Sequence, residues 1–97
     1  MSDYILSQHK KEQGQKVITI VTKIQNKLFK YQLNDMKDLF SEFVEKMNYY
    51  LNYIEEEEKI YSFREALNLA EIAFENRDYL LLADILEYEI LRLVKLN

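Results

Sequence analysis

Turn-forming residues are almost absent from this chain, whose 97 residues include no proline and one glycine, Gly14. Antiparallel sheets need many tight turns, and those turns depend on glycine, proline or Asn-Gly pairs. Short connections between packed helices do not need these residues. An all-β fold is therefore disfavoured, and we expect an all-α fold.

The composition indicates one small globular domain without disulfides. Hydrophobic residues form 48% of the chain and charged residues 31%, which is typical of a folded domain. A chain of this size builds a single core and leaves little room for a deep active-site cleft. The chain has no cysteine, which excludes disulfides, thiolate metal ligands and cysteine nucleophiles.

The apolar runs are too short for a secretory signal or a membrane span. Near the N-terminus only Tyr4, Ile5 and Leu6 are consecutive apolar residues, whereas the core of a signal peptide has roughly 7–15. No apolar run approaches the roughly 18 residues that cross a bilayer. We therefore expect a cytoplasmic protein with no membrane partner.

Charge is distributed unevenly along the chain. Residues 1–31 carry six lysines and two acidic residues, for a net charge of +4. Residues 32–97 carry seven lysines and arginines and fifteen acidic residues, for a net charge of −8. The acidic body disfavours nucleic acid as the main partner. We expect the basic segment to pair with this body, and a basic arm for an external anion is the alternative.

Apolar residues recur at helical spacing after a polar start. The clearest series is Met36, Leu39, Phe40, Phe43, Val44, Met47, Leu51 and Ile54. An earlier series ends with Leu28 and Tyr31. We expect a polar tail at 1–15 and a helical bundle at 16–97, with helices at about 16–32, 35–56, 62–75 and 78–95. The short breaks predict a four-helix up-down bundle made of two antiparallel helical hairpins.

Capping residues mark the predicted helix starts. Asn34 or Asp35 precedes the second helix and Asp78 precedes the fourth, each with a side-chain oxygen for free backbone N–H groups. Ser62 opens a Ser-Phe-Arg-Glu capping box for the third helix. The acidic run 55–58 is unfavourable near the negative end of a helix, so we expect the second helix to end or bend there.

The two halves of the chain align when one is shifted by 43 residues. Asp35 then falls on Asp78, and Phe43 falls on Leu86. Both halves read as a helix, a polar break, a capping aspartate and a second helix. Identity between them is low, so a true duplication and a chance alignment of two amphipathic hairpins both remain open.

Residues for catalysis or metal binding are missing or isolated. The one histidine, His9, lacks the Glu-x-x-His motif of di-iron bundles. Ser41 and Ser62 have no neighbouring histidine to act as a base, and one glycine does not make a phosphate-binding loop. The run 55–58 is a solvated charge run rather than a calcium loop. We therefore expect no enzyme activity, no metal and no cofactor.

The last helix carries more apolar surface than one core needs. The stripe that faces the bundle consists of Leu82, Leu86, Ile90 and Leu93. Further apolar residues point elsewhere, and such exposed patches usually mark interfaces. Tyr49 and Tyr53 fit either the periphery of the core or a contact patch. The candidate protein-interface residues are Leu80, Leu81, Ile85, Tyr88, Leu91, Tyr49 and Tyr53.

The acidic, cysteine-free, four-helix pattern with spare apolar surface resembles flagellin-export chaperones and related small secretion chaperones. This resemblance covers most of the chain, as architecture alone. Residues 76–89, Asn-Arg-Asp-Tyr-Leu-Leu-Leu-Ala-Asp-Ile-Leu-Glu-Tyr-Glu, are similar to a segment of short uncharacterised helical proteins of Firmicutes bacteria. The chaperone resemblance implies binding of an aggregation-prone helical partner segment. Neither resemblance assigns a functional residue.

Two functions are consistent with the spare apolar stripe. The first is a helical protein-binding module, such as a chaperone-like adaptor, that lays a partner helix against the last helix. The alternative is a self-associating structural homodimer that uses the same stripe. In the second case, Leu81→Glu or Ile85→Glu should give monomers.

Overall fold

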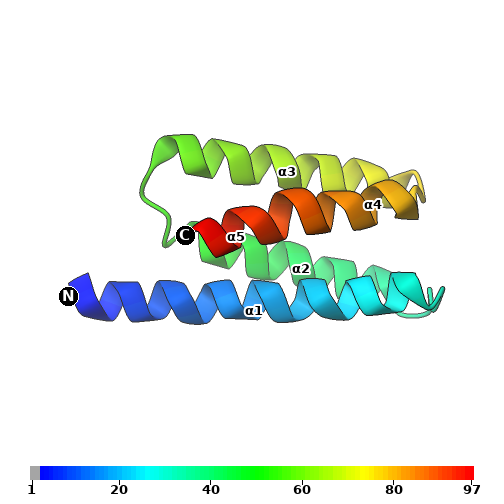
Figure 1. The fold of residues 1–97 in the computed structure, drawn as a ribbon, viewed down its shortest axis with the longest axis horizontal. Coiled ribbons are helices and arrows are strands. Elements are labelled where there is room, and N and C mark those ends of the chain that lie inside the picture. The colour runs from blue at the N-terminus through cyan, green and yellow to red at the C-terminus, as the bar shows by residue number, and fades with distance from the viewer. Residues whose placement is uncertain (1–2) are drawn as a thin grey trace.

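The structure is a computed structural model that describes residues 3–97, and Figure 1 shows it as a bundle of helices. The first three helices are α1 (Asp3–Phe29), α2 (Met36–Leu51) and α3 (Glu57–Glu75). The last helix has three consecutive segments, α4 (Tyr79–Ile85), the π-helical η1 (Leu86–Leu91) and α5 (Arg92–Leu96). Residues 3–97 contain no strand. The predicted all-α four-helix bundle is confirmed.

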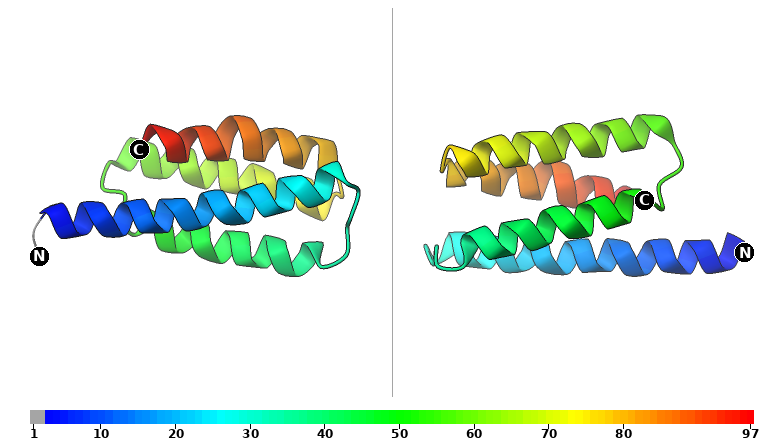
Figure 2. Two further views of the ribbon diagram at one scale, coloured as in Figure 1. Left: turned by 60° about the horizontal axis from the view of Figure 1, so that its bottom comes forward. Right: turned by 180° about the vertical axis from the view of Figure 1, so that it is seen from behind.

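Consecutive helices run antiparallel, as the two views in Figure 2 show. α1 lies against α2 and also against the last helix, and α3 lies against the last helix and α2. The shape is elongated, with extents of 44 × 21 × 18 Å. The two hairpins therefore close into one bundle around a shared core.

The first helix begins at Asp3, so the predicted polar tail and the predicted start near residue 16 are wrong. Figure 1 shows the N-terminal end of α1 projecting past the rest of the bundle. The His9 ring stands edge-on to the Tyr53 ring, with centroids 6.1 Å apart. Further along, Gly14 is buried against Tyr50. These long-range contacts hold a segment whose own apolar spacing is too sparse to predict a helix.

The helix starts agree with the predicted caps in part. Asp78 caps α4 as expected, because its Oδ1 accepts a hydrogen bond from the Leu81 backbone N–H at 3.1 Å. Asp35 holds the N-cap position of α2 but makes no capping side-chain bond. The predicted Ser62 cap is wrong, since α3 begins at Glu57 and the Ser62 hydroxyl donates to the Glu58 carbonyl. Acidic residues in the first turn of α3 suit the positive end of its dipole.

α1 and α3 meet at the buried ring of Tyr50, on α2, and α5 packs beside this point. The Phe63 ring of α3 packs edge-on against the Tyr50 ring, with centroids 5.6 Å apart. A Cβ atom added at Gly14 on α1 would lie 3.2 Å from Tyr50 Cε1 and 3.5 Å from Val94 Cγ1 on α5. The single glycine of the chain therefore allows α1 to approach this ring closely.

The π-helical segment η1 corrects a mismatch in the apolar spacing of the last helix. The buried pairs Ile85–Leu86 and Ile90–Leu91 are separated by five residues, whereas one α-helical face recurs every three to four. In a regular helix, Leu91 would point roughly half a turn away from Leu82. The wider π turn absorbs the extra residue. Both pairs consequently face the core, and three consecutive exposed residues are left on the outside, namely Glu87, Tyr88 and Glu89.

We predict that Gly14→Val lowers the free energy of unfolding by about 1–3 kcal/mol, because the added atoms overpack the contact with Tyr50. Urea unfolding followed by circular dichroism measures the change. The control is Gln15→Val, which places the same side chain on the exposed side of α1 and should cost only a few tenths of a kcal/mol. A Gly14→Val protein as stable as the control would show that this contact is not close-packed.

We predict that deletion of Glu89 leaves the free energy of unfolding within about 1 kcal/mol of wild type, because a regular α-helix then carries both buried pairs on one face. Deletion of the exposed Glu45 in the regular helix α2 is the matched control. It rotates the following core residues, Met47, Tyr50 and Leu51, by roughly 100° and should cost several kcal/mol. Equal losses in the two deletions would contradict this account of η1.

Candidate functional site: a groove between α1 and α4

A groove of about 750 Å³ lies between the C-terminal end of α1 and the last helix. The wall from α1 and the turn after it consists of Gln25, Asn26, Leu28, Phe29 and Tyr31. The opposite wall consists of Arg77, Asp78, Tyr79, Leu80, Ala83, Asp84, Glu87 and Tyr88. We call this feature the α1/α4 groove. It has the concave form and mixed lining of a binding site.

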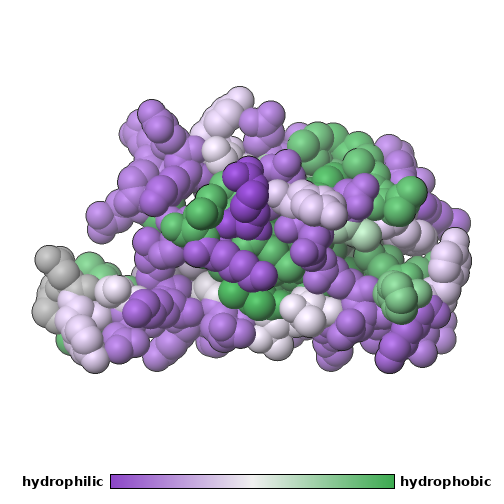
Figure 3. All heavy atoms as spheres, viewed as in Figure 1, coloured by the Kyte–Doolittle hydropathy of each residue, from purple (hydrophilic) through white to green (hydrophobic). Residues whose placement is uncertain are grey.

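Large apolar side chains surround the groove without being covered. Phe29 is 90% exposed, Tyr31 81%, Leu80 78% and Tyr88 66%. Single exposed apolar residues are ordinary on protein surfaces, but here they gather around one hollow. Figure 3 shows apolar side chains collected over α3, α4 and the C-terminal end of α1. Exposed apolar side chains gathered around one hollow are typical of an interaction surface.

The C-terminal end of α1 is closed by a Schellman motif that places Tyr31 at the groove. The Tyr31 N–H donates to the Leu28 carbonyl at 3.1 Å, and the Gln32 N–H donates to the Lys27 carbonyl at 2.8 Å. This motif needs a left-handed residue, which is usually glycine. Tyr31 occupies that position with φ of 56°. Its aromatic ring is therefore held at the groove at the expense of backbone strain.

The same motif ends α3 and places Arg77 at the groove. The Arg77 N–H donates to the Phe74 carbonyl at 3.0 Å, and the Asp78 N–H donates to the Ala73 carbonyl at 2.9 Å. Arg77 also has a positive φ of 56°. Two strained non-glycine residues thus line one groove. Strain of this kind clusters at functional sites.

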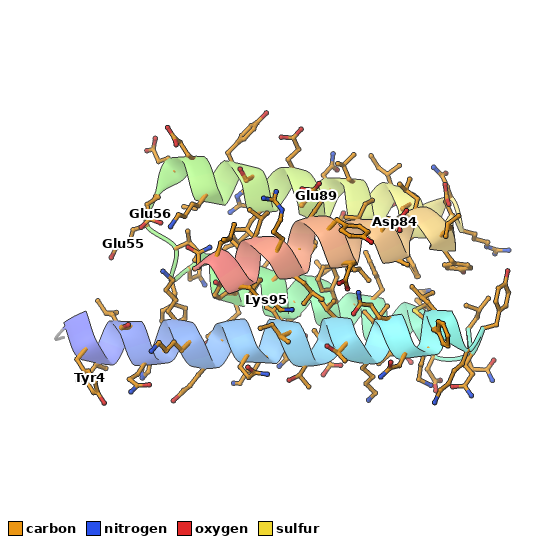
Figure 4. The ribbon with its side chains drawn as sticks, viewed as in Figure 1. Tyr4, Glu55, Glu56, Asp84, Glu89 and Lys95 are labelled. Atoms are coloured by element: carbon orange, nitrogen blue, oxygen red, sulfur yellow. The ribbon has the colours of Figure 1, made fainter. Side chains whose placement is uncertain are left out.

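Carboxylates from α4 and η1 give the groove a negative wall. Glu87 Oε2 accepts a hydrogen bond from Gln25 Nε2 at 2.8 Å, which bridges the last helix and α1. Asp78 is engaged as the cap of α4. The ion pairs between described residues, Lys59–Glu56 and Arg92–Glu89, lie outside the groove lining. Figure 4 labels Asp84 and Glu89 on the last helix.

The structure divides the predicted interface residues of the last helix into three groups. Leu80 and Tyr88 line the α1/α4 groove. Leu81 is about half exposed and lies outside the groove lining. Ile85 and Leu91 are each only 6% exposed and belong to the core, so their assignment to an exposed interface is wrong. The prediction assumed a narrow core stripe on a regular helix, whereas the bundle buries a wider arc and η1 turns Leu91 inward.

The two tyrosines predicted on α2 are not part of this groove. Tyr49 is exposed, and Tyr53 is half-buried against His9. Tyr53 also lines a separate hollow of about 230 Å³ with Lys10 and Glu56. The Lys59 ammonium, 3.2 Å from the Glu56 carboxylate, lowers the pKa of that carboxyl by hydrogen bonding. The structure therefore does not gather the predicted interface residues into one surface.

Sequence reasoning missed the α1 side of the groove. Tyr31 is expected on the core face of the first helix, but the Schellman motif turns it outward. Phe29 lies beside Leu28 and off the core spacing, and this position is a usable sequence signal for an exposed aromatic residue. Arg77 gave no sequence signal, because its left-handed conformation is visible only in the backbone.

Among the side chains of residues 4–97, no three histidines, aspartates or glutamates come together in a way that could hold a metal ion. None of the helices in this part of the chain has the length and apolar character needed to cross a membrane.

A family model described as a domain of unknown function, DUF8042, matches residues 6–96, which include both walls of the groove. No curated protein and no solved structure matches the chain. Because the family model extends over more than half of the sequence, the chain belongs to the DUF8042 family.

Proposed function

We propose that this protein is a non-enzymatic helical protein-binding module that holds an amphipathic partner helix in the α1/α4 groove. The observation that carries the proposal is the gathering of Phe29, Tyr31, Leu80 and Tyr88 around one open groove. Burying a single leucine-sized side chain in an interface contributes about 1.5–3 kcal/mol. Together these side chains provide enough apolar surface to anchor a short helix.

The dimensions of the groove suit a helix rather than an extended segment. The wall formed by the last helix and its cap runs from Asp78 to Tyr88, which is about 15 Å along a helix axis. Two or three turns of a partner helix cover that length and present apolar residues at i, i+3, i+4 and i+7. The walls come from two helices, whose side chains leave a channel between them. An extended peptide would find no free sheet edge here, since residues 3–97 form no strand.

The backbone strain at Tyr31 and Arg77 supports the same site. Glycine at either position would relieve the strain, so folding alone does not favour these residues. A tyrosine side chain offers a rigid amphipathic contact at low entropic cost. Contacts of both side chains with a bound partner would offset this strain.

Self-association through the same groove is the rival function, and sedimentation velocity distinguishes the two. A monomer that binds a separate helix supports the proposal, whereas a stable dimer that Leu80→Glu dissociates would replace it. Ile85→Glu is no longer a suitable test of a dimer, because Ile85 is buried and a charge there would unfold the monomer. If the chaperone resemblance holds, the partner helix belongs to an aggregation-prone protein.

We predict that Leu80→Ser weakens binding of a helical peptide by roughly tenfold or more, because Leu80 is an apolar anchor of the groove. The peptide is selected on the wild-type protein from a displayed library of helical sequences, and fluorescence anisotropy gives its dissociation constant. Leu96→Ser is the matched control, since Leu96 is 70% exposed but lies on α5 outside the groove lining. Equal effects of the two substitutions, or no selectable peptide, would refute the proposal.

We predict that Tyr31→Gly raises the free energy of unfolding by about 1 kcal/mol while weakening binding of the same peptide. The gain arises because glycine accepts the left-handed backbone without strain, and the loss arises because the ring leaves the groove. Urea unfolding and peptide titration measure the two effects. Gln32→Gly is the control and should lower stability without affecting binding. A Tyr31→Gly protein that binds the peptide normally would exclude Tyr31 from the site.

A further inference from the structure

We infer that the helix which occupies the α1/α4 groove is basic, and that it places a lysine or arginine against Asp84. The inference rests on the proposed function and adds the charge of the partner and the residue that recognises it. It comes from the charges of the groove walls and from the bonds that those charges already make.

The two walls differ in charge. The α1 wall consists of neutral side chains, two of them the amides Gln25 and Asn26. The opposite wall carries the carboxylates of Asp78, Asp84 and Glu87 and one cation, Arg77. A partner helix therefore meets negative charge on one side and neutral amide and aromatic groups on the other. Complementary charge on the partner is expected on the side that faces α4.

Asp84 is the carboxylate of this wall that is left for a partner. Asp78 accepts the capping hydrogen bond of α4, and Glu87 accepts the hydrogen bond from Gln25. Among residues 3–97 the structure gives Asp84 neither a hydrogen bond nor an ion pair. Its side chain is exposed. An unpaired carboxylate is ready to accept an N–H donor from lysine or arginine.

The position of Asp84 makes an ion pair with a bound helix stronger than an ordinary surface pair. Asp84 lies four residues after Leu80 and four before Tyr88, so apolar anchors lie on either side of it. A helix packed on both anchors would exclude water from the carboxylate between them. Attraction between charges increases as water is excluded, provided that the opposite charge is present. An acidic or neutral helix at this place would leave the carboxylate desolvated without a partner.

Within the groove lining, three carboxylates face one cation, Arg77, so the wall keeps a net charge of −2. Lys16, Lys23 and Lys46 line a separate hollow between α1 and α2. Lys59 and Arg92 pair with glutamates next to them in the sequence. The net charge of the chain, −4, would also attract a basic segment from a distance at low ionic strength.

The test starts from the selection of helical peptides on the wild-type protein, with all residue types allowed beside an apolar stripe. We expect the selected peptides to be enriched in lysine and arginine over aspartate and glutamate. Replacement of the enriched basic residue by glutamine should weaken binding by roughly fivefold to tenfold, which corresponds to about 1–1.4 kcal/mol. The difference should shrink in about 0.5 M salt, where screening is strong.

Asp84→Asn should abolish this dependence on the basic residue, and Glu89→Gln is its matched control. Both substitutions remove one negative charge from the last helix, but Glu89 pairs with Arg92 and is not part of the groove lining. The Glu89→Gln protein should therefore bind the basic peptide within about twofold of wild type, an effect of a distant surface charge.

The outcomes separate the inference from the proposed function. Peptides that bind through Leu80 but show no basic preference would overturn the inference and leave the protein-binding module standing. Equal weakening of peptide binding by Asp84→Asn and Glu89→Gln would show that the basic preference comes from the negative charge of the protein as a whole. That result would overturn the role of Asp84. Failure to select any peptide would overturn the proposed function and the inference with it.

Discussion

The close contact between Gly14 and the ring of Tyr50 determines how the helices of this bundle meet. Tyr50 is almost fully buried, and burial raises the pKa of its hydroxyl. α1 reaches the ring through Gly14 and α3 through Phe63, and Val94 of α5 lies next to Gly14. Because α1 is held at this point, one end of it projects beyond the bundle and the other end forms a wall of the groove.

The π-helical segment η1 places residues both in the core and at the groove. The sequence of the last helix contains one residue too many for a regular amphipathic stripe, and η1 keeps Ile90 and Leu91 in the core despite it. Its outer side carries Glu87 and Tyr88 at the groove. The Arg92 Nε–H donates to the Tyr88 carbonyl at 3.0 Å, which supports the turn from outside. A departure from ideal packing geometry thus contributes directly to the candidate site.

The sequence was sufficient for the fold class, because missing turn residues and apolar periodicity are local signals. The Asp78 cap was predictable for the same reason. The start of α1 was not, since it depends on contacts of His9 and Gly14 with α2, far away in the sequence. On the last helix, the sequence predicts the exposure of Leu80 and Tyr88. It misplaces Ile85 because the bundle buries an arc wider than one stripe, and Leu91 because the π turn rotates it inward. The left-handed conformation of Tyr31 likewise has no local sequence signal, because it depends on how the end of α1 is closed.

Two residues whose conformation folding alone does not favour border the same groove. Tyr31 and Arg77 adopt a left-handed conformation that glycine would adopt without strain. Asp35, the other described non-glycine residue with positive φ, is of a type that tolerates this conformation. The tight contact at Gly14, in contrast, lies near the opposite end of the bundle. Features that reduce stability are expected where a protein contacts something else, so their coincidence with exposed apolar side chains favours the α1/α4 groove as the place where this chain acts.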